Sequence, residues 1–460
     1  MVNTPRPRGR TSGGSVLQGD FFNREMETLT PEELRRVQEA KLASQVRYVH
    51  EHSPFYRKKL VAAGLQPDDV STLEGLARLP FTTKEELRDS QLADPPLGSH
   101  AAVPMSEIIR IHASTGTTGR PSYVGVTRHD AAVWTDLTSR SLYAQGIRKE
   151  DIVIHAVGLT MFVGGLPVKD ATEALGATLV PIGTGASEKV VMALQTLKAN
   201  VLHCTPSYAV YLAEYVRSHY GLDPRELGLE RIISGAEPGA GIPAVRQRIE
   251  GEWGVRLTEG LGNADMAPVI FGECPHQQGM HFNAQEYIIP EIIDPDSGAP
   301  LAIEKGVSGE LVYTAIDREC CPLLRFRTRD RVVVTATDCA CGRTSFQIRC
   351  VGRTDDMLIV LGVNVFPSAL KDTIASFVPE TTGELQIMLD EPPPKVAPPL
   401  RITVEYGRDV GDLAALRAKI EGLIKDRLSI PCKVDLVPPE TLPRYDMKGQ
   451  LVRRLYEEAR

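Results

Sequence analysis

The stretch ASTGTTGRPS at residues 113–122 has the residue types of a loop that binds phosphate groups. Its two glycines allow the backbone to approach an anion closely, and its hydroxyl residues and arginine offer hydrogen-bond donors and positive charge. The spacing differs from that of the P-loop pattern GxxxxGK[ST], and an ordinary surface turn is the alternative. The candidate phosphate-binding residues are Ser114, Thr115, Gly116, Thr117, Thr118, Gly119 and Arg120.

Two cysteine-containing segments have the residues of a metal site. ECPHQQGMH supplies Cys274 and His281, and DCACG supplies Cys339 and Cys341. Three thiols and one imidazole suit tetrahedral Zn²⁺ and leave no open coordination position, so the predicted role is structural. His276 competes with His281 as the nitrogen ligand, and buried cysteines without a metal are the alternative.

An α/β core is predicted to position these segments. From about residue 105 to 350, short β-branched runs alternate with helical patterns, which is typical of a domain with largely buried strands. The runs DIVIHAVG, ATLVPIG, NVLHCTPS and ERIISGAEP predict strands, and ASEKVVMALQTLKA and GIPAVRQRIEGEWG predict helices. A further helix is predicted upstream, where Thr30 can cap, Pro31 suits the first turn and Glu33 completes a capping box.

The pattern changes after the strands GELVYTAI and DRVVVTAT. A small α+β domain is indicated by two strand-like segments, PLRITVEYG and CKVDLVP, with a helical pattern between them over DLAALRAKIEGLIKDRLS. We place the domain boundary near Gly352. The predicted organisation is a disordered tail over residues 1–20, a large α/β domain with mixed or parallel sheets over 21–352, and a small domain over 353–460.

The composition excludes several classes of protein. Hydrophobic residues at 42% and charged residues at 24% are ordinary globular values, and a net charge of −7 argues against a dedicated nucleic-acid binder. No apolar run approaches the roughly 20 residues that span a bilayer. No apolar segment follows the basic N-terminus, so a secretory signal is not predicted, and the eight cysteines fit a reducing cytoplasm. We expect a cytoplasmic protein without nucleic-acid or membrane partners.

Several motifs, taken in order, resemble those of the adenylate-forming superfamily of acyl-CoA synthetases, adenylation domains and luciferases. The similarity is greatest to the phenylacetate-CoA ligase branch and runs from about residue 20 to the C-terminus. The motifs are ASTGTTGRPSYVGVT, SPFYRKKL, LPFTTKEELRD, SGAEP, FRTRD, GRTDDMLIVLGVNVFPS and LPRYDMKGQ. The resemblance implies that the loop at 113–122 holds ATP phosphates, although Arg120 stands where the branch has lysine.

The resemblance also implies nucleotide contacts beyond this loop. Asp330 matches the aspartate on the ribose hydroxyls, where a carboxylate can accept two hydrogen bonds, and Arg353 matches a nucleotide contact. A helix cap for Glu237 and a surface ion pair for Asp330 are the alternatives. The segment on the adenine side comprises Ser234, Gly235, Ala236, Glu237 and Pro238.

Members of the superfamily are expected to use one domain arrangement for adenylation and another for thioester formation. Asp355 matches the hinge residue, so the resemblance implies a mobile C-terminal domain. Lys448 matches the catalytic lysine that stabilises charge on the α-phosphate, although Met447 replaces the preceding glycine. A rigid turn at Asp355 and a solvated lysine at 448 are the alternatives.

The segment TEGLGNADMAPVIFGEC departs from the family pattern Tyr-Gly-Leu-Ser/Thr-Glu before the Glu-Cys pair. One register places Asn263 at the acidic position and another places Asp265 there. We favour Asp265 as the catalytic acid near Mg²⁺, because Mg²⁺ on a triphosphate prefers a carboxylate to an amide. The adenine-facing tyrosine is absent, and the acyl pocket of the family lies nearby, which puts phenylacetate in doubt as the substrate.

The leading prediction is an AMP-forming ligase that activates an aryl or arylacetic-type acid with ATP and Mg²⁺ and transfers the acyl group to coenzyme A. One alternative passes the acyl group to a carrier-protein thiol or an amine. The other is a non-catalytic, zinc-containing interaction protein. The resemblance further implies structural Zn²⁺, carried at matching positions by some relatives, and a homodimer.

Overall fold

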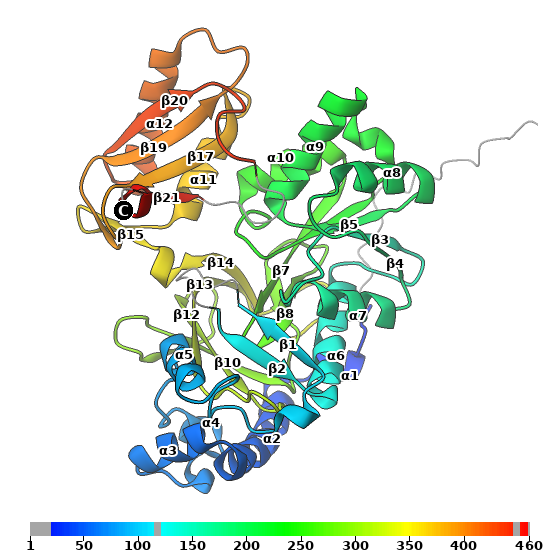
Figure 1. The fold of residues 1–460 in the computed structure, drawn as a ribbon, viewed down its shortest axis with the longest axis vertical. Coiled ribbons are helices and arrows are strands. Elements are labelled where there is room, and N and C mark those ends of the chain that lie inside the picture. The colour runs from blue at the N-terminus through cyan, green and yellow to red at the C-terminus, as the bar shows by residue number, and fades with distance from the viewer. Residues whose placement is uncertain (1–19, 115–120, 445–450, 459–460) are drawn as a thin grey trace, which may run out of the picture.

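The computed structural model describes residues 20–114, 121–444 and 451–458 of the 460-residue chain (Figure 1). Helices precede the sheets, and the longest begins as predicted: Thr30 Oγ accepts from the Glu33 amide, and Glu33 Oε2 accepts from the Thr30 amide at 2.8 Å. The elements of this segment are α1 (Arg24–Glu27), α2 (Pro31–His52), α3 (Pro54–Ala62), η1 (Pro67–Val70), α4 (Leu73–Leu76), α5 (Lys84–Ala93) and η2 (Met105–Glu107).

Strands and helices then alternate as the sequence predicts. The strands are β3 (Ile152–His155), β4 (Thr178–Pro181), β5 (Val201–Cys204), β6 (Arg231–Ser234) and β7 (Arg256–Asn263). The helices are α6 (Arg128–Ala144), α7 (Leu166–Ala174), α8 (Ser187–Leu197), α9 (Pro206–Tyr220), η3 (Pro224–Leu227) and α10 (Pro243–Trp253).

These five strands pair in parallel in the order β7-β6-β5-β3-β4. Successive strand residues face opposite sides of the sheet. Val153 and Val201 pack with residues of α6 and α7, whereas Ile154 and Leu202 pack with residues of α8, α9 and α10. Both faces are therefore covered, which explains why the strand sequences are continuously apolar.

Antiparallel strands extend this sheet to 12 strands, in the order β11-β10-β12-β13-β14-β9-β8 next to β7. A separate antiparallel hairpin carries the predicted phosphate loop between its two strands. The extending strands are β8 (Ala267–Glu273), β9 (Met280–Phe282), β10 (Ile288–Ile293), β11 (Pro300–Leu301), β12 (Ser308–Ala315), β13 (Phe326–Ala336) and β14 (Gln347–Arg353). The hairpin is β1 (Arg110–Ala113) and β2 (Tyr123–Val126).

The C-terminal part has its own apolar core, built from residues of 358–434. Its main sheet has the order β20-β19-β17-β21, and Figure 1 shows it above the large sheet, on the side of α10. The elements are η4 (Thr354–Asp356), β15 (Leu358–Val360), β16 (Val363–Val365), α11 (Pro367–Ala375), β17 (Thr381–Leu389), β18 (Lys395–Val396), β19 (Leu400–Tyr406), α12 (Leu413–Leu428), β20 (Cys432–Val437), β21 (Val452–Arg454) and α13 (Leu455–Glu458).

The α/β fold class is thus confirmed, with mixed sheets and a smaller α+β part after β14. The domain limits at 20, 352 and 460 remain predictions. Within the described ranges, no helix combines the length and the apolar character that crossing a membrane requires.

Candidate functional site

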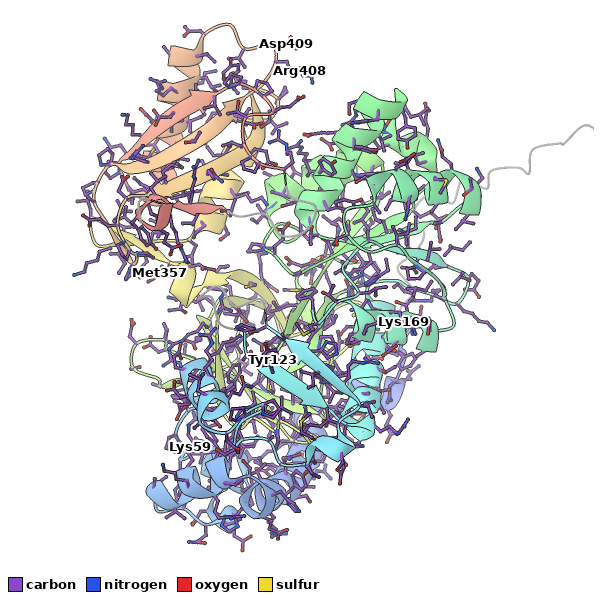
Figure 2. All side chains as sticks on the ribbon, in the orientation of Figure 1. Lys59, Tyr123, Lys169, Met357, Arg408 and Asp409 are labelled. Atoms are coloured by element: carbon purple, nitrogen blue, oxygen red, sulfur yellow. The ribbon has the colours of Figure 1, made fainter. Side chains whose placement is uncertain are left out.

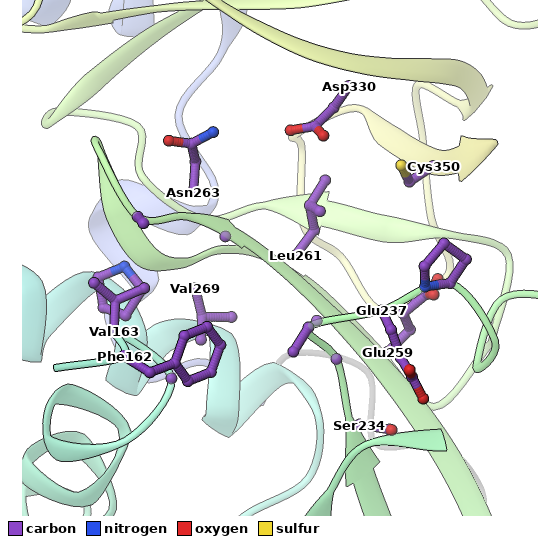
Figure 3. A pocket seen from close by; sticks show the side chains of 18 of the residues that line it. Phe162, Val163, Ser234, Glu237, Glu259, Leu261, Asn263, Val269, Asp330 and Cys350 are labelled. Atoms are coloured by element: carbon purple, nitrogen blue, oxygen red, sulfur yellow. The ribbon is translucent and has the colours of Figure 1, made fainter. Parts of the chain in front are cut away.

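A cavity of about 420 Å³ brings together predicted residues that are far apart in the sequence (Figure 3). It lies against the carboxyl ends of β5 and β6, where ligands commonly bind in open α/β sheets. Its lining includes the predicted residues Ser114, Ser234, Gly235, Ala236, Glu237, Pro238, Asn263, Asp265, Asp330 and Arg353. The remaining predicted phosphate-loop residues, 115–120, lie outside the described residues, and so does Lys448.

The base of the predicted phosphate loop is closed by hydrogen bonds. The Ser114 amide donates to the Ser122 carbonyl at 2.9 Å, and the Ser122 amide donates to Ser114 Oγ at 3.0 Å. Ser114 is also the last described residue before the loop and lines the cavity. The β1–β2 hairpin therefore holds the two ends of the loop together, with the Ser114 end at the cavity wall.

Asp265 is connected directly to this base. Ser122 Oγ donates to Asp265 Oδ1 at 2.6 Å, and Lys84 Nζ lies 2.9 Å from Asp265 Oδ2. The Asp265 side chain is only 2% exposed, so its charge is balanced mainly by Lys84. Asn263 Oδ1 instead accepts from the Asp265 amide at 3.0 Å and supports the backbone turn.

Lys84 is a site residue that we did not assign from the sequence. It is the first residue of α5, whose N-cap Thr83 forms a capping box with Glu86. This cap fixes where the helix starts and hence where Lys84 points. The position of Lys84 within the motif LPFTTKEELRD, at a capped helix start, was the available signal.

The predicted adenine-side segment follows β6. Glu237 Oε1 accepts from the Ser207 amide at 2.8 Å, in the first turn of α9, so its carboxylate caps that helix as the alternative interpretation held. Ala236 has φ 70°, a left-handed conformation that is costly for a residue with a Cβ and is frequent at functional sites.

Asp330 and Arg353 lie opposite each other in the register of β13 and β14. Arg353 Nη1 is 3.2 Å from Asp330 Oδ1, but Asp330 is buried, so this is not the surface ion pair that we held as the alternative. Both residues also line the cavity, so the pair lies at the predicted ribose position. Asp355 lies in η4 immediately after β14, and Met357, which follows η4, lies between the two parts of the chain (Figure 2).

Glu259 is a second cavity residue that we did not assign from the sequence. Burial, followed by the neighbouring charge of Glu273, raises the pKa of Glu259 to about 7. Arg246 Nη2 lies 2.6 Å from Glu273 Oε2 and therefore neutralises Glu273 more directly than Glu259. Such perturbed carboxyls concentrate at functional sites. Its only sequence signal was a single acidic residue within RLTEGLGN, the sequence of β7.

The part of the cavity that faces α6 and α7 is mainly apolar. In Figure 3, Phe162, Val163 and Val269 gather together, away from Asp330 and Glu237. Three further apolar lining residues pack with Val269 in one cluster, namely Leu142, Val168 and Ile233. An apolar extension beside polar groups suits the organic part of a small acid.

The four predicted metal ligands come together away from this cavity. Their ligand atoms all lie within 4.8 Å of one another, in the set Cys274, His281, Cys339 and Cys341. Cys274 Sγ is 3.7 Å from Cys339 Sγ, and Cys341 Sγ is 3.4 Å from His281 Nε2. With Zn–S bonds of about 2.3 Å, tetrahedral geometry separates two thiolates by about 3.8 Å. The donor set therefore fits Zn²⁺, with His281 rather than His276 in the group.

The C-terminal part and the whole chain both match known proteins. Residues 362–454 match the family model "AMP-binding enzyme C-terminal domain". The chain is 39% identical over 459 residues to a phenylacetate-coenzyme A ligase of Thermus thermophilus, covering 95% of this chain and 99% of that protein. It is 37% identical over 354 residues to a phenylacetate-coenzyme A ligase of Escherichia coli, covering 76% of this chain and 78% of that protein.

Solved structures of a 2-hydroxyisobutyryl-CoA ligase are also similar. Its postadenylation state in complex with R3-HIB-AMP is 30% identical, with a TM-score of 0.88, covering 99% of this chain and 95% of that chain. Its thioesterification state in complex with 2-HIB-AMP and CoA is 31% identical, with a TM-score of 0.70 and the same coverage. The arrangement of the present chain is therefore more similar to the first of these states.

Proposed function

The chain belongs to the phenylacetate-CoA ligase branch of the adenylate-forming superfamily, and we propose from this membership and its cavity that it activates an aromatic carboxylic acid. It is an AMP-forming acid–CoA ligase. In the first step, a carboxylate oxygen attacks the α-phosphorus of ATP, giving acyl-AMP and pyrophosphate. In the second step, the thiol of coenzyme A attacks the acyl carbon, giving the thioester and releasing AMP.

The observation that carries this proposal is the shared cavity, which joins the base of the phosphate loop to an apolar extension. Ser114 and Asp265 would face the triphosphate end, and Phe162 and Val269 the organic part of the acid. The acid carboxylate would then lie between them, close to the α-phosphate. Such positioning of two reactants supplies much of the rate enhancement of a two-substrate enzyme.

Mg²⁺ fits beside Asp265. A carboxylate has about four lone-pair sites, so Asp265 can keep its contacts with Ser122 and Lys84 and still hold a cation. Protein-bound Mg²⁺ commonly uses one or two carboxylates together with substrate phosphates. When bound, Mg²⁺ would neutralise charge on the triphosphate, and Lys84 would add a second positive charge at the same edge.

The remaining nucleotide contacts follow the predicted assignments. Asp330 would accept from the ribose hydroxyls, with Arg353 holding its carboxylate in place, and residues 235–238 would line the adenine. Lys448 would stabilise the charge that develops on the α-phosphate as the acyl-AMP bond forms. Asp355 would be the pivot about which the C-terminal part moves between the two steps.

The test measures AMP release by the purified protein with benzoates, phenylacetates, heteroaromatic acids and 2-hydroxyisobutyrate, with and without coenzyme A. An aromatic acid that gives AMP and a CoA thioester supports the proposal. Formation of acyl-AMP without a CoA thioester would favour a carrier-protein thiol or an amine as the acceptor. Absence of ATP–pyrophosphate exchange with every acid would favour the non-catalytic alternative.

We also propose a structural Zn²⁺ held by Cys274, His281, Cys339 and Cys341. Supporting this proposal, the ligand atoms match tetrahedral spacing, and His281 Nδ1 lies 3.5 Å from Ser345 Oγ, a second contact that would orient the ring. The ion would tie β9 to the loop that precedes β14. A homodimer in the cytoplasm is the proposed state, tested by sedimentation and cell fractionation.

A further inference from the structure

The apolar extension of the cavity contains very few polar side chains. Between residues 142 and 204, a fully described stretch, nine residues line the cavity. Gln145 and His203 are the only two of these with nitrogen or oxygen in the side chain. Because polar groups in an apolar pocket fix the orientation of a ligand, these two residues indicate what the extension recognises.

Gln145 follows α6 and is 2% exposed. Its Nε2 donates to the Ser141 carbonyl at 3.2 Å, whereas its Oε1 is buried and has no hydrogen-bond partner among the described residues. The Ser141 carbonyl can only accept, so the NH₂ group of Gln145 must face it. The free atom is therefore the oxygen, an acceptor that calls for a donor.

Gly260 keeps the Gln145 amide next to the cavity. Both residues line the cavity, and a Cβ at Gly260 would lie 3.3 Å from Gln145 Nε2 and 3.6 Å from Oε1. Any larger residue would therefore cover the amide from the side of β7. Glycine at 260 therefore allows the backbone of β7 to approach the amide closely.

His203 makes the wall formed by β5 polar without giving it a charge. Its Nδ1 lies 2.9 Å from Nδ1 of His155, which is fully buried. Burial lowers the pKa of His203 to about 4, and it lowers the pKa of His155 as well. Both rings are therefore neutral near pH 7, so this wall favours an uncharged polar substituent over a second carboxylate or an ammonium group.

We propose that the acid carries a hydroxyl or amino group on its ring, which donates a hydrogen bond to Gln145 Oε1. This inference rests on the proposed function, since it names the class of acid that the same cavity takes. An unsubstituted acid would leave the Gln145 oxygen buried and unpaired. A site built around such a bond discriminates strongly against the analogue that lacks the donor.

The test compares matched acids with the wild-type protein by AMP release. Benzoate and phenylacetate are each compared with their hydroxy, amino and methyl derivatives at the ortho, meta and para positions. We expect at least one hydroxy- or amino-substituted acid to exceed both its parent and its methyl analogue in kcat/KM by roughly 10-fold or more, since a buried polar group left unpaired loses its hydration without compensation. Equal use of parent, methyl and donor-bearing acids would overturn the inference.

Two variants test whether Gln145 causes the preference for acids that carry a donor. Gln145→Leu should bring the ratio between donor-bearing and methyl acids close to 1 or invert it. Thr258→Val is the matched control, because Thr258 is buried with an unpartnered hydroxyl in neighbouring β7 but does not line the cavity. It should keep the wild-type ratio, and a ratio unchanged in Gln145→Leu would overturn the inference.

The comparison of acids with the wild-type protein tests the inference even where a variant fails to fold. If no acid supports AMP release, the proposed function itself has failed. If acids are activated without any preference for a donor, only the present inference has failed.

Discussion

Lys84 and Asp265 are 181 positions apart in the sequence, yet Lys84 Nζ lies 2.9 Å from Asp265 Oδ2. The pair joins the start of α5 to the strand turn after β7, and Ser122 extends the connection to the phosphate loop. Three segments without local sequence contact thus meet at one carboxylate. This meeting point is where we expect the triphosphate end of ATP.

Asp265→Asn tests the register that we favour. It keeps the shape of the side chain but removes the charge that would face Mg²⁺, so adenylation should fall by roughly 10²-fold, the scale for one preorganised electrostatic group. ATP–pyrophosphate exchange measures this step, and thermal unfolding checks that the variant is folded. Asn263→Ala is the control and should lose far less. The reverse ranking would show that Asn263 occupies the acidic position.

Glu259 should make the ligand-free protein less stable as pH rises from about 4.5 to about 7. Its pKa is raised from 4.5 to about 7 by burial and then by Glu273, so in this range the folded state holds a proton that the unfolded state has released. The free energy of unfolding should fall by up to about 3 kcal/mol across the window and then level off.

Glu259→Gln removes this titration and should flatten the pH dependence over the same window. Urea unfolding at pH 5, 6, 7 and 8 measures the effect for both proteins. Parallel loss of stability in the wild type and the variant would assign the slope to other groups.

Measurement of the zinc content tests the proposed metal site at Cys274, His281, Cys339 and Cys341. Elemental analysis should give close to one equivalent per chain, and Cys339→Ser should lower both metal content and thermal stability, because a structural zinc contributes directly to folding free energy. Cys432→Ser is a control at a cysteine outside the group. Full zinc retention in the Cys339→Ser, Cys341→Ser double variant would rule out this site.

Local patterns were sufficient for much of the fold. The capping box at Thr30 and Glu33 predicted the start of α2, and the β-branched runs predicted the parallel strands. Both signals act over a few residues, through backbone hydrogen bonds and side-chain periodicity. The extension of the sheet to 12 strands depends on pairing between distant segments, which such patterns do not contain.

The site residues also divide into those that sequence motifs could identify and those that depend on contacts between distant segments. Asp330 and Glu237 belong to motifs that could be matched by resemblance, whereas Asp265 was chosen between two registers, and all three line the cavity. Lys84 and Gln145 could not be assigned because their significance depends on partners far away, Asp265 in one case and Gly260 in the other. Only the folded chain brings these pairs together.

Arg248 connects the two parts of the chain in the present arrangement. This residue of α10 donates through Nη1 to the Thr382 carbonyl in β17, and its Nη2 lies 2.9 Å from Glu214 Oε1 in α9. Glu214 Oε2 also lies 3.8 Å from Nε of Arg444, which is four residues before Lys448 in the sequence. These contacts hold the two parts in an arrangement that is more similar to the postadenylation structure than to the thioesterification structure of the 2-hydroxyisobutyryl-CoA ligase.

Arg248→Met should therefore reduce adenylation more than thioester formation. Losing contacts of this kind costs about 1–2 kcal/mol, so pyrophosphate exchange should fall about 5- to 30-fold. Thioester formation from synthetic acyl-AMP and coenzyme A should stay near the wild-type rate, since that step uses the other arrangement. Arg217→Met is the matched control, because Arg217 of α9 pairs with Glu252 within the large part, at 3.8 Å.

Lys448→Ala tests a direct role in the chemistry of adenylation, in contrast to Arg248→Met, which tests the positioning of the C-terminal part. It should lower pyrophosphate exchange by roughly 10²-fold or more, because the missing charge would act on the α-phosphate itself. Transfer from synthetic acyl-AMP should again persist.

Asp355→Pro should give the opposite pattern if the fixed φ of proline holds the chain in its adenylating arrangement, with thioester formation falling more than adenylation. Equal loss of both half-reactions in Lys448→Ala and Asp355→Pro would show that this protein does not alternate between two arrangements.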